Sequence, residues 1–216
     1  MVSQQYLSPG LFSLFFNLAA QVARSLGLCH WNSLNHQFNP SRESQTRQNL
    51  LFCMYTLDKA LSWTTGQSPG IQMPKRDFLV GPVDIQDKLT SPLPARVKLA
   101  AIEERIFTEL YCEKPGLCTD TQFLPHFRRY HQKLENWWNE SSPSLDGPHG
   151  FNSFTSASQA ELIISFHSTR MLVNWPAREE LDASGQILDD ARTCLRLFLQ
   201  LWNNTSQLEL YSTLIR

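Results

Sequence analysis

The sequence lacks the excess of basic residues that a nucleic-acid-binding module usually carries. Its 216 residues include 19 Lys and Arg against 20 Asp and Glu, so the formal net charge is −1. Phosphate neutralisation by Lys and Arg supplies much of a protein's affinity for duplex DNA. The most basic places, Lys75-Arg76 and Arg128-Arg129, are isolated pairs. We therefore predict that this chain by itself does not bind DNA directly.

Cysteine is scarce as well, and its arrangement argues against two kinds of site. The five cysteines are an odd number, and no two of them are separated by two residues. A disulfide framework needs an even number in a small secreted chain, so reduced thiols in a nuclear or cytosolic protein fit better. Cys29, His30 and His36 fall in one polar loop, but a structural zinc site needs a fourth ligand. The sequence thus predicts no metal and no cofactor in this chain.

Motifs of catalysis and membrane insertion are also absent. There is no HExxH, GxGxxG or phosphate-cradling GxxxxGK. No apolar stretch approaches the roughly 20 residues of a membrane span. Cys29 and His30 could act as nucleophile and base only if adjacent loop side chains met, and no carboxylate lies nearby to orient the imidazole. We predict no catalytic residue, no enzyme activity and no membrane association.

What the sequence has in abundance is helical periodicity. A first helix is expected to start at Ser8-Pro9, where Ser caps the helix and Pro fits its first turn. Apolar residues then recur every three or four positions, at Leu11, Phe15, Leu18, Val22 and Leu26. Gly27 suits the left-handed conformation that ends a helix. We expect this apolar face to pack against the core.

The second helix is predicted to run from about Ser41–Ser44 to Thr64 and to form the centre of the core. Its apolar face is formed by Leu50, Met54, Leu57 and Leu61, and residues 50–55 are apolar on every side. A loop follows at 65–92, where prolines and glycines replace any sustained period. A central helix needs neighbours all round, and the first helix starts close to Met1. We therefore expect the natural domain to have more helices upstream.

Four more helical segments follow, each with apolar residues at helical spacing. They are marked by Leu99, Ile102, Ile106 and Leu110; by Phe123, Phe127, Tyr130, Leu134 and Trp137; by a stretch that stops at Pro176; and by Ile187, Ala191, Leu195, Phe198 and Trp202. A shorter helix is expected after Ser206, and a flexible break is predicted at 141–153. No alternating run indicates a strand. The prediction is one all-α domain over 1–216, an irregular bundle of about six to seven helices.

One charged residue lies within the apolar face of the second helix. Asp58 shares that face with Leu51 and Met54, and Arg47 lies three turns earlier on the same face. A carboxylate in such a place needs a partner to offset its desolvation. Two interpretations stay open: a structural ion pair, in which an arginine from another helix could take part, and a catalytic acid.

Three stretches together resemble the fungal-specific transcription factor domain. In "FFNLAAQVARSLGLCHW", Leu26, Gly27 and Leu28 match a Leu-Gly-Leu-His signature, with Cys29 in the His position. "SRESQTRQNLLFCMYTLDKALSWTTGQSPGIQMPKRDF" is similar to the family's next block, with matches at Glu43, Arg47, Leu57, Asp58, Leu61 and Gly66. In that block Lys59 replaces an Arg, and Gln67-Ser68-Pro69 replaces Arg-Pro. "AELIISFHSTRMLVNWP" resembles a later helix that has a Tyr-His pair and a terminal Arg-Pro.

The resemblance implies the helical regulatory region of a transcription factor. In the family this region follows a DNA-binding zinc cluster of six cysteines and a short dimerising coiled coil, and zinc is expected only in that cluster of full-length relatives. The resemblance implies a structural signature of Leu26, Gly27, Leu28, Arg47, Asp58 and Gly66. Candidate contacts with a ligand or partner are Gln67, Lys75 and Arg76 in the loop, together with Trp138. Trp138 is included because Trp137 and Trp138 are adjacent and cannot both face inward.

The function predicted from these observations is that of a regulatory domain in the nucleus. It would control transcriptional activity through contacts with a small-molecule effector or with transcriptional co-regulators, and full-length relatives could form homodimers. The alternative is a stand-alone helical protein that binds a ligand or partner, located in the cytoplasm if a DNA-binding half is truly absent. A helical enzyme is a further alternative, although no convergent polar set supports it.

Overall fold

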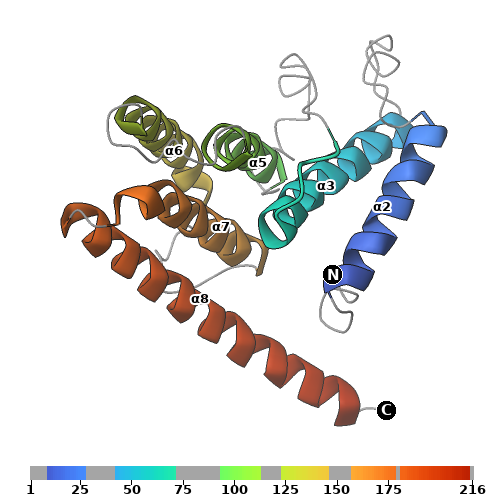
Figure 1. Ribbon diagram of the computed structural model, residues 1–216. Helices are drawn as coiled ribbons and strands as arrows, with labels where there is room; N and C mark the ends of the chain where they lie inside the picture. Colours follow the sequence, from blue (N-terminus) through green and yellow to red (C-terminus); the bar gives the residue numbers. More distant parts are fainter. Residues whose placement is uncertain are drawn as a thin grey trace. The chain divides into compact units, whose positions relative to one another are not determined.

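The computed structural model describes residues 9–27, 42–71, 93–112, 123–145, 157–178 and 181–214 (Figure 1). The α-helices in these ranges are α2 (Pro9–Ser25), α3 (Arg42–Thr65), α5 (Leu93–Ile106), α6 (Phe123–Leu145), α7 (Ala157–Asn174) and α8 (Leu181–Leu214). A π-helical segment, η3 (Phe107–Cys112), continues α5, and a 3₁₀ turn, η5 (Trp175–Ala177), follows α7. The described ranges contain no strand, so the predicted all-α class is confirmed. None of these helices is long and apolar enough to cross a membrane.

The chain divides into two compact units, residues 1–88 and residues 89–216. Unit 1 contains α2 and α3, and unit 2 contains α5 to α8. The single domain over 1–216 and the further helices upstream stay predictions.

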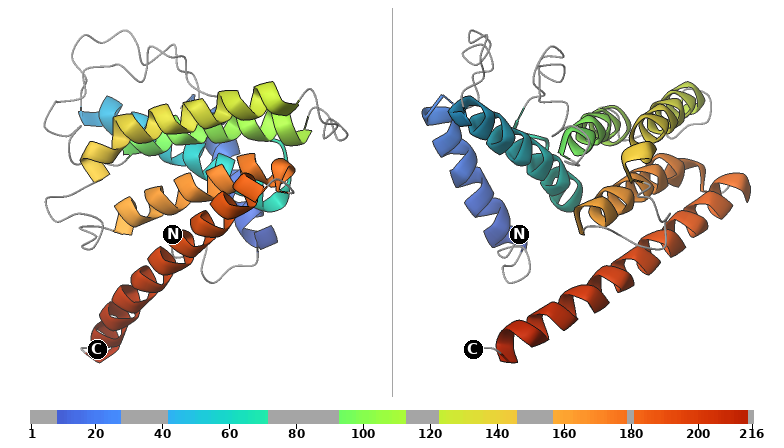
Figure 2. Two further views of the ribbon diagram at one scale, coloured as in Figure 1. Left: turned by 90° about the vertical axis from the view of Figure 1, so that its left-hand side faces the viewer. Right: turned by 180° about the vertical axis from the view of Figure 1, so that it is seen from behind.

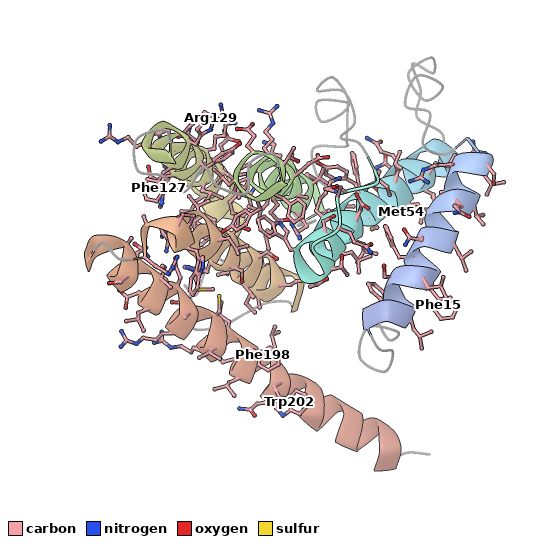
Figure 3. The ribbon with its side chains drawn as sticks, in the orientation of Figure 1. Phe15, Met54, Phe127, Arg129, Phe198 and Trp202 are labelled. Carbon is pink, nitrogen blue, oxygen red and sulfur yellow. The ribbon has the colours of Figure 1, made fainter. Side chains whose placement is uncertain are left out.

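In unit 1, helix α2 buries a different face from the one predicted. It starts at Pro9, as the sequence predicts, and its chain leaves through Gly27 at a left-handed φ of 71°. The predicted packing face is 45% to 67% exposed: Leu11, Phe15, Leu18, Val22 and Leu26. The buried residues are Phe16, Ala20 and Ala23. Figure 3 shows Phe15 on the side of α2 that faces away from α3. Two alanines allow close approach of another helix, so side-chain size and not the number of large apolar residues marks the packing face.

Helix α3 is also rotated relative to the prediction. Of the predicted face only Met54 is buried, whereas Leu50 is 48% exposed and Leu57 and Leu61 are partly buried. The buried side chains are those of Leu51, Phe52, Met54, Tyr55, Asp58, Lys59 and Ser62. Because residues 50–55 are apolar all round, their periodicity does not determine which face is inside. The buried face includes Asp58 and Lys59, which bind the following loop.

Unit 2 is built in three layers. Figure 2 shows α7 between the pair formed by α5 and α6 and the long helix α8, and contacts join α7 to all three. The core between them contains Val97, Leu99, Ile106, Tyr130, Leu134, Trp137, Leu162, Ile163, Phe166, Val173 and Leu197. Trp137 Nε1 on α6 donates to the carbonyl oxygen of Ala95 on α5 at 2.9 Å. Of the predicted inward positions in these two segments, five are buried (Leu99, Ile106, Tyr130, Leu134 and Trp137), and Ile102, Leu110 and Phe127 are partly buried. The side chain of Phe123 lies outside the described residues.

Two elements of unit 2 extend further than the sequence predicts. Helix α6 continues to Leu145, through the first residues of the predicted break, and residues 146–153 lie outside the described ranges. Helix α8 runs without interruption to Leu214, so the short helix expected after Ser206 is part of it. The predicted inward face of α8 is wrong, because Leu195, Phe198 and Trp202 are 63%, 55% and 62% exposed. The buried residues Ala183, Asp190 and Leu197 lie on the other side of the helix.

Candidate functional site

The candidate site lies in unit 1, where the carboxylate of Asp58 binds the backbone of the loop that follows α3. Asp58 is 7% exposed. Its Oδ1 accepts from the Gly70 N–H at 3.1 Å, and its Oδ2 accepts from the Ile71 N–H at 2.9 Å. Lys59 Nζ lies 3.0 Å from the same Oδ2. Such charge-assisted bonds satisfy a buried carboxylate well, which supports the structural interpretation of Asp58 over the catalytic one.

Lys59 completes the attachment of the loop. It is 1% exposed, its Nζ also donates to the carbonyl oxygen of Ile71, and the ammonium lies 4.5 Å from the centre of the Tyr55 ring. Two adjacent residues of α3 therefore bind both the N–H and the C=O of Ile71, whose own side chain is buried. We call this arrangement of Asp58, Lys59 and the backbone of residues 70–71 the clamp.

The loop between the helix and the clamp is shaped by glycine and by a second helix. Gly66 adopts a left-handed φ of 69°, and its N–H donates to the Ser62 carbonyl oxygen at 2.9 Å, which ends α3. At the other end, the Arg24 guanidinium of α2 donates to the Gly70 carbonyl oxygen at 3.2 Å. Residues 66–71 are thus attached to both helices of unit 1.

A polar cavity of about 60 Å³ lies beside the clamp. Its lining residues come from α2, α3 and the loop: Ser13, Phe16, Asn17, Ala20, Arg24, Asp58, Leu61, Ser62, Thr65, Gln67, Ser68 and Gly70. That volume is room for about two water molecules or a polar group of similar size. The lining offers hydroxyls, amides and a guanidinium, groups that can form hydrogen bonds to a small polar ligand.

The predicted site residues are only partly brought together. Asp58, Gly66 and Gln67 belong to the clamp region, whereas Arg47 has an exposed side chain and the cation next to Asp58 is Lys59. Leu26 and Gly27 form the exit of α2. Leu28, Lys75 and Arg76, like Cys29, His30 and His36, lie outside the described residues. Trp138 is partly buried in unit 2, where its ring stacks on Phe166 at 4.5 Å.

Three participants were missed by the sequence analysis: Arg24, Gly70 and Ile71. Gly70 and Ile71 act through backbone atoms, which no side-chain pattern reveals. An arginine from another helix was left open as a partner of Asp58, without naming Arg24, and Arg24 donates to the loop carbonyl of Gly70. The only available signal was the charged pair Asp58-Lys59 inside an apolar face, followed by a helix-ending glycine.

A second buried carboxylate, in unit 2, joins α7 to α8. Asp190 is 1% exposed and lies 2.8 Å from His167 Nδ1, while Arg170 Nε donates to its Oδ2 at 2.9 Å. Gln186 Nε2 donates to Oδ1 at 3.3 Å. Burial alone would raise the pKa of Asp190, but hydrogen bonds from His167 and Arg170 and the charge of Arg170 lower it below its ordinary value. This set packs two helices together.

Two further polar clusters in unit 2 also connect helices. Glu103 of α5 accepts from Arg96 at 2.9 Å and from Thr169 of α7 at 3.1 Å. Glu109 of η3 pairs with Arg129 of α6 at 2.7 Å. Burial would raise the pKa of Glu109, but hydrogen bonds from Tyr130 and Arg129 lower it. Among the described residues no group of three or more His, Cys, Asp and Glu side chains could hold a metal ion.

Comparison with known proteins places the chain in a family. The model of the fungal specific transcription factor domain matches residues 1–139, which include α2, α3 and the clamp. The transcription factor sphG of Aspergillus fumigatus (strain CBS 144.89 / FGSC A1163 / CEA10) is 32% identical over 212 residues. That match covers 94% of this chain and 28% of the relative, so the chain spans little more than a quarter of that protein's length. No solved structure matches the chain. The chain belongs to the fungal specific transcription factor domain family.

Proposed function

We propose that this chain is a regulatory domain of a fungal transcription factor, that it acts in the nucleus, and that it controls transcriptional activity through ligand or protein contacts at the clamp. Family membership and the similarity to sphG support a role in transcription and not in catalysis. The observation that carries the finer proposal is the clamp itself. Residues that the family resemblance singles out, Asp58 and Gly66, hold a loop against a polar cavity.

The clamp offers a physical route from binding to a change of shape. Buried charge-assisted hydrogen bonds attach the loop to α3. Between the loop and α2, the structure shows one hydrogen bond, which the exposed Arg24 donates. A small polar effector in the cavity, or a co-regulator side chain, would compete for Arg24 and for Gln67. A ligand shifts a conformational equilibrium only by its difference in affinity between the two states. The state without the Arg24–Gly70 bond is the one such a ligand would favour.

The experiment that tests this proposal places the chain between a heterologous DNA-binding domain and a heterologous activation domain. Reporter output is compared for the wild type, Asp58→Asn and Asp189→Asn. Asp189 is a matched control because its exposed carboxylate pairs with Arg192 on the surface of α8. We expect Asp58→Asn to change the output several-fold at equal protein level and Asp189→Asn to leave it unchanged. Equal output from all three fusions contradicts a regulatory role for the clamp.

A screen for an effector adds a direct measurement. Candidate metabolites are added to the purified chain and to Gln67→Ala, and the melting temperature is followed. A metabolite that stabilises the wild type but not Gln67→Ala, and that also changes reporter output, supports an effector site at the cavity. A metabolite that binds without changing the output supports the stand-alone binding protein instead.

A further inference from the structure

The guanidinium of Arg24 brings a positive charge to the polar cavity beside the clamp. Its Nη2 donates to the Gly70 carbonyl oxygen at 3.2 Å. A guanidinium has several N–H donors, so this bond leaves others for further acceptors. Among the described residues, no Asp or Glu side chain forms an ion pair with Arg24. In this part of the chain, the cavity therefore has a cation whose charge no neighbour offsets.

The other two charged groups beside the cavity offset each other. Asp58 lines the cavity, but its Oδ1 and Oδ2 accept hydrogen bonds from the N–H groups of Gly70 and Ile71. The Lys59 ammonium lies 3.0 Å from Oδ2. A carboxylate and an ammonium at this distance carry no net charge together. The charge that the cavity presents to a ligand is therefore that of Arg24.

The remaining polar side chains of the lining supply neutral donors. The hydroxyls of Ser62 and Thr65 are used, because they donate to carbonyl oxygens of α3 at 2.9 and 2.8 Å. The side chains of Asn17, Gln67 and Ser68 have no hydrogen-bond partner within the described ranges. Amides and hydroxyls can donate to an anion as well as to water. One cation surrounded by neutral donors is a suitable environment for a single negative charge.

We propose that the cavity binds the carboxylate of a small organic acid, with Arg24 as its cation; this names the ligand class of the proposed function and rests on that function. A planar guanidinium offers two parallel N–H groups that match the two oxygens of a carboxylate. The cavity volume of about 60 Å³ holds a carboxylate group and little more. A phosphate dianion would bring a second charge, for which the described lining offers no second cation.

A carboxylate in the cavity would change how the loop is held. Its charge makes it a stronger acceptor than the peptide carbonyl oxygen of Gly70. The acid would therefore take the guanidinium of Arg24 from the loop, while Asp58 and Lys59 keep their bonds to it. Binding thus favours the state without the Arg24–Gly70 bond.

Gly70 allows the site to be narrowed without the loss of a charge. A Cβ at residue 70 would lie 3.5 Å from Arg24 Nη2 and 3.6 Å from Asp58 Oδ1, which are ordinary contact distances. Gly70 has no left-handed φ, unlike Gly66, so its backbone accepts alanine. The methyl group of Gly70→Ala would occupy space beside the guanidinium that a carboxylate needs.

The test is the binding of acetate to the purified chain at neutral pH and constant ionic strength, followed by the NMR shifts of the amides in residues 66–71. We expect saturable shifts with a dissociation constant in the millimolar range, because so small a ligand makes few contacts. Acetamide has the same shape without the charge and should cause no saturable shift.

Variants assign the binding to the cavity. Arg24→Gln should raise the dissociation constant for acetate at least tenfold, because the charged two-pronged donor is lost. Gly70→Ala should weaken acetate binding although both charges remain, and it decides the test if Arg24→Gln fails to fold. Arg192→Gln is the matched control: Arg192 is exposed on α8 and pairs with Asp189, so its loss should leave acetate binding unchanged.

The other ligand classes give different results, and each overturns the proposal. Equal binding of acetamide would mean that the cavity recognises shape and not charge. Inorganic phosphate that binds more tightly than acetate would make a phosphate the ligand class. Saturable shifts with methylammonium would mean that Asp58 and not Arg24 recognises the ligand. The absence of saturable acetate binding, or acetate binding that survives both Arg24→Gln and Gly70→Ala, contradicts the proposal as well.

Reporter output separates this inference from the function on which it rests. A chain that binds acetate through Arg24, while the wild-type and Asp58→Asn fusions give equal output, would support the ligand class and contradict the regulatory role. A chain that does not bind acetate, while Asp58→Asn changes the output, would overturn the ligand class and leave the regulatory role standing.

Discussion

Asp58 in unit 1 and Asp190 in unit 2 are both buried carboxylates, but they are satisfied by different kinds of partner. Asp58 binds two backbone N–H groups and the side chain next to it in sequence. Asp190 binds the side chains of His167 and Arg170 on α7 and of Gln186 on its own helix. The first arrangement determines the path of a loop, and the second determines how α7 packs on α8. A buried aspartate therefore has a local role in unit 1, where it holds a loop. In unit 2 it contributes to the stability of the whole unit, because it joins two helices.

The largest effect that this comparison predicts is for Asp190→Ala. The variant leaves the guanidinium of Arg170 partly buried without its carboxylate, and breaking a buried pair in this way costs about 3–5 kcal/mol. We expect the free energy of unfolding measured with urea to fall by that amount. Asp189→Ala is the control, since its pair with Arg192 is exposed and contributes about 0–1 kcal/mol. Equal losses for the two variants would mean that the Asp190 cluster does not hold the helices together.

The effect of Asp58→Asn should be smaller and local. An amide keeps the shape and one acceptor oxygen but loses the charge and one of the two bonds to residues 70–71, which costs about 1–3 kcal/mol. Limited proteolysis should cut the loop near residues 66–71 sooner in this variant than in the wild type. An Asp58→Asn chain that loses as much stability as Asp190→Ala would show that the clamp supports more than the loop.

The smallest effect predicted is the dependence of stability on acid. The pKa of Asp190 is lowered in the folded chain, so its ionised form contributes stability that is complete above the ordinary carboxyl pKa of about 3.9 and is lost as the pH falls through the lower, folded-state value. We expect the stability of the wild type to fall more steeply below about pH 4 than that of Asp190→Asn. Thermal melts between about pH 3 and pH 7 measure the two slopes. Parallel curves would contradict the pairing of Asp190 with Arg170.

Sequence reasoning predicted the class and the positions of the helices better than it predicted their orientation. Pro9 and Gly27 mark the ends of α2 correctly because proline and glycine act through the backbone of their own segment. The packing faces of α2 and α8 were wrong for one shared reason. Both helices carry apolar residues on two sides, and the larger set proved to be the exposed one. Periodicity identifies an apolar face, but only the neighbours determine which face is covered.

The clamp could be predicted only in part. A carboxylate inside an apolar helix face indicated that Asp58 needs a partner, and the prolines and glycines after Thr64 indicated where the helix ends. The partners themselves are backbone groups of residues 70 and 71, and any sequence supplies those. The Asp190 cluster was missed because its partners on α7, His167 and Arg170, are 23 and 20 positions from Asp190 in the sequence.

Hydrogen exchange at the amides of Gly70 and Ile71 tests the role of the clamp most directly. These two N–H groups donate to Asp58, so their protection reports the clamp and nothing else on the loop. We predict that Asp58→Asn speeds exchange at both amides at least tenfold while the amides of α7 and α8 keep their protection, and that Asp190→Asn does the reverse. Unchanged protection of Gly70 and Ile71 in Asp58→Asn would contradict the assignment of Asp58 as the residue that fixes the loop.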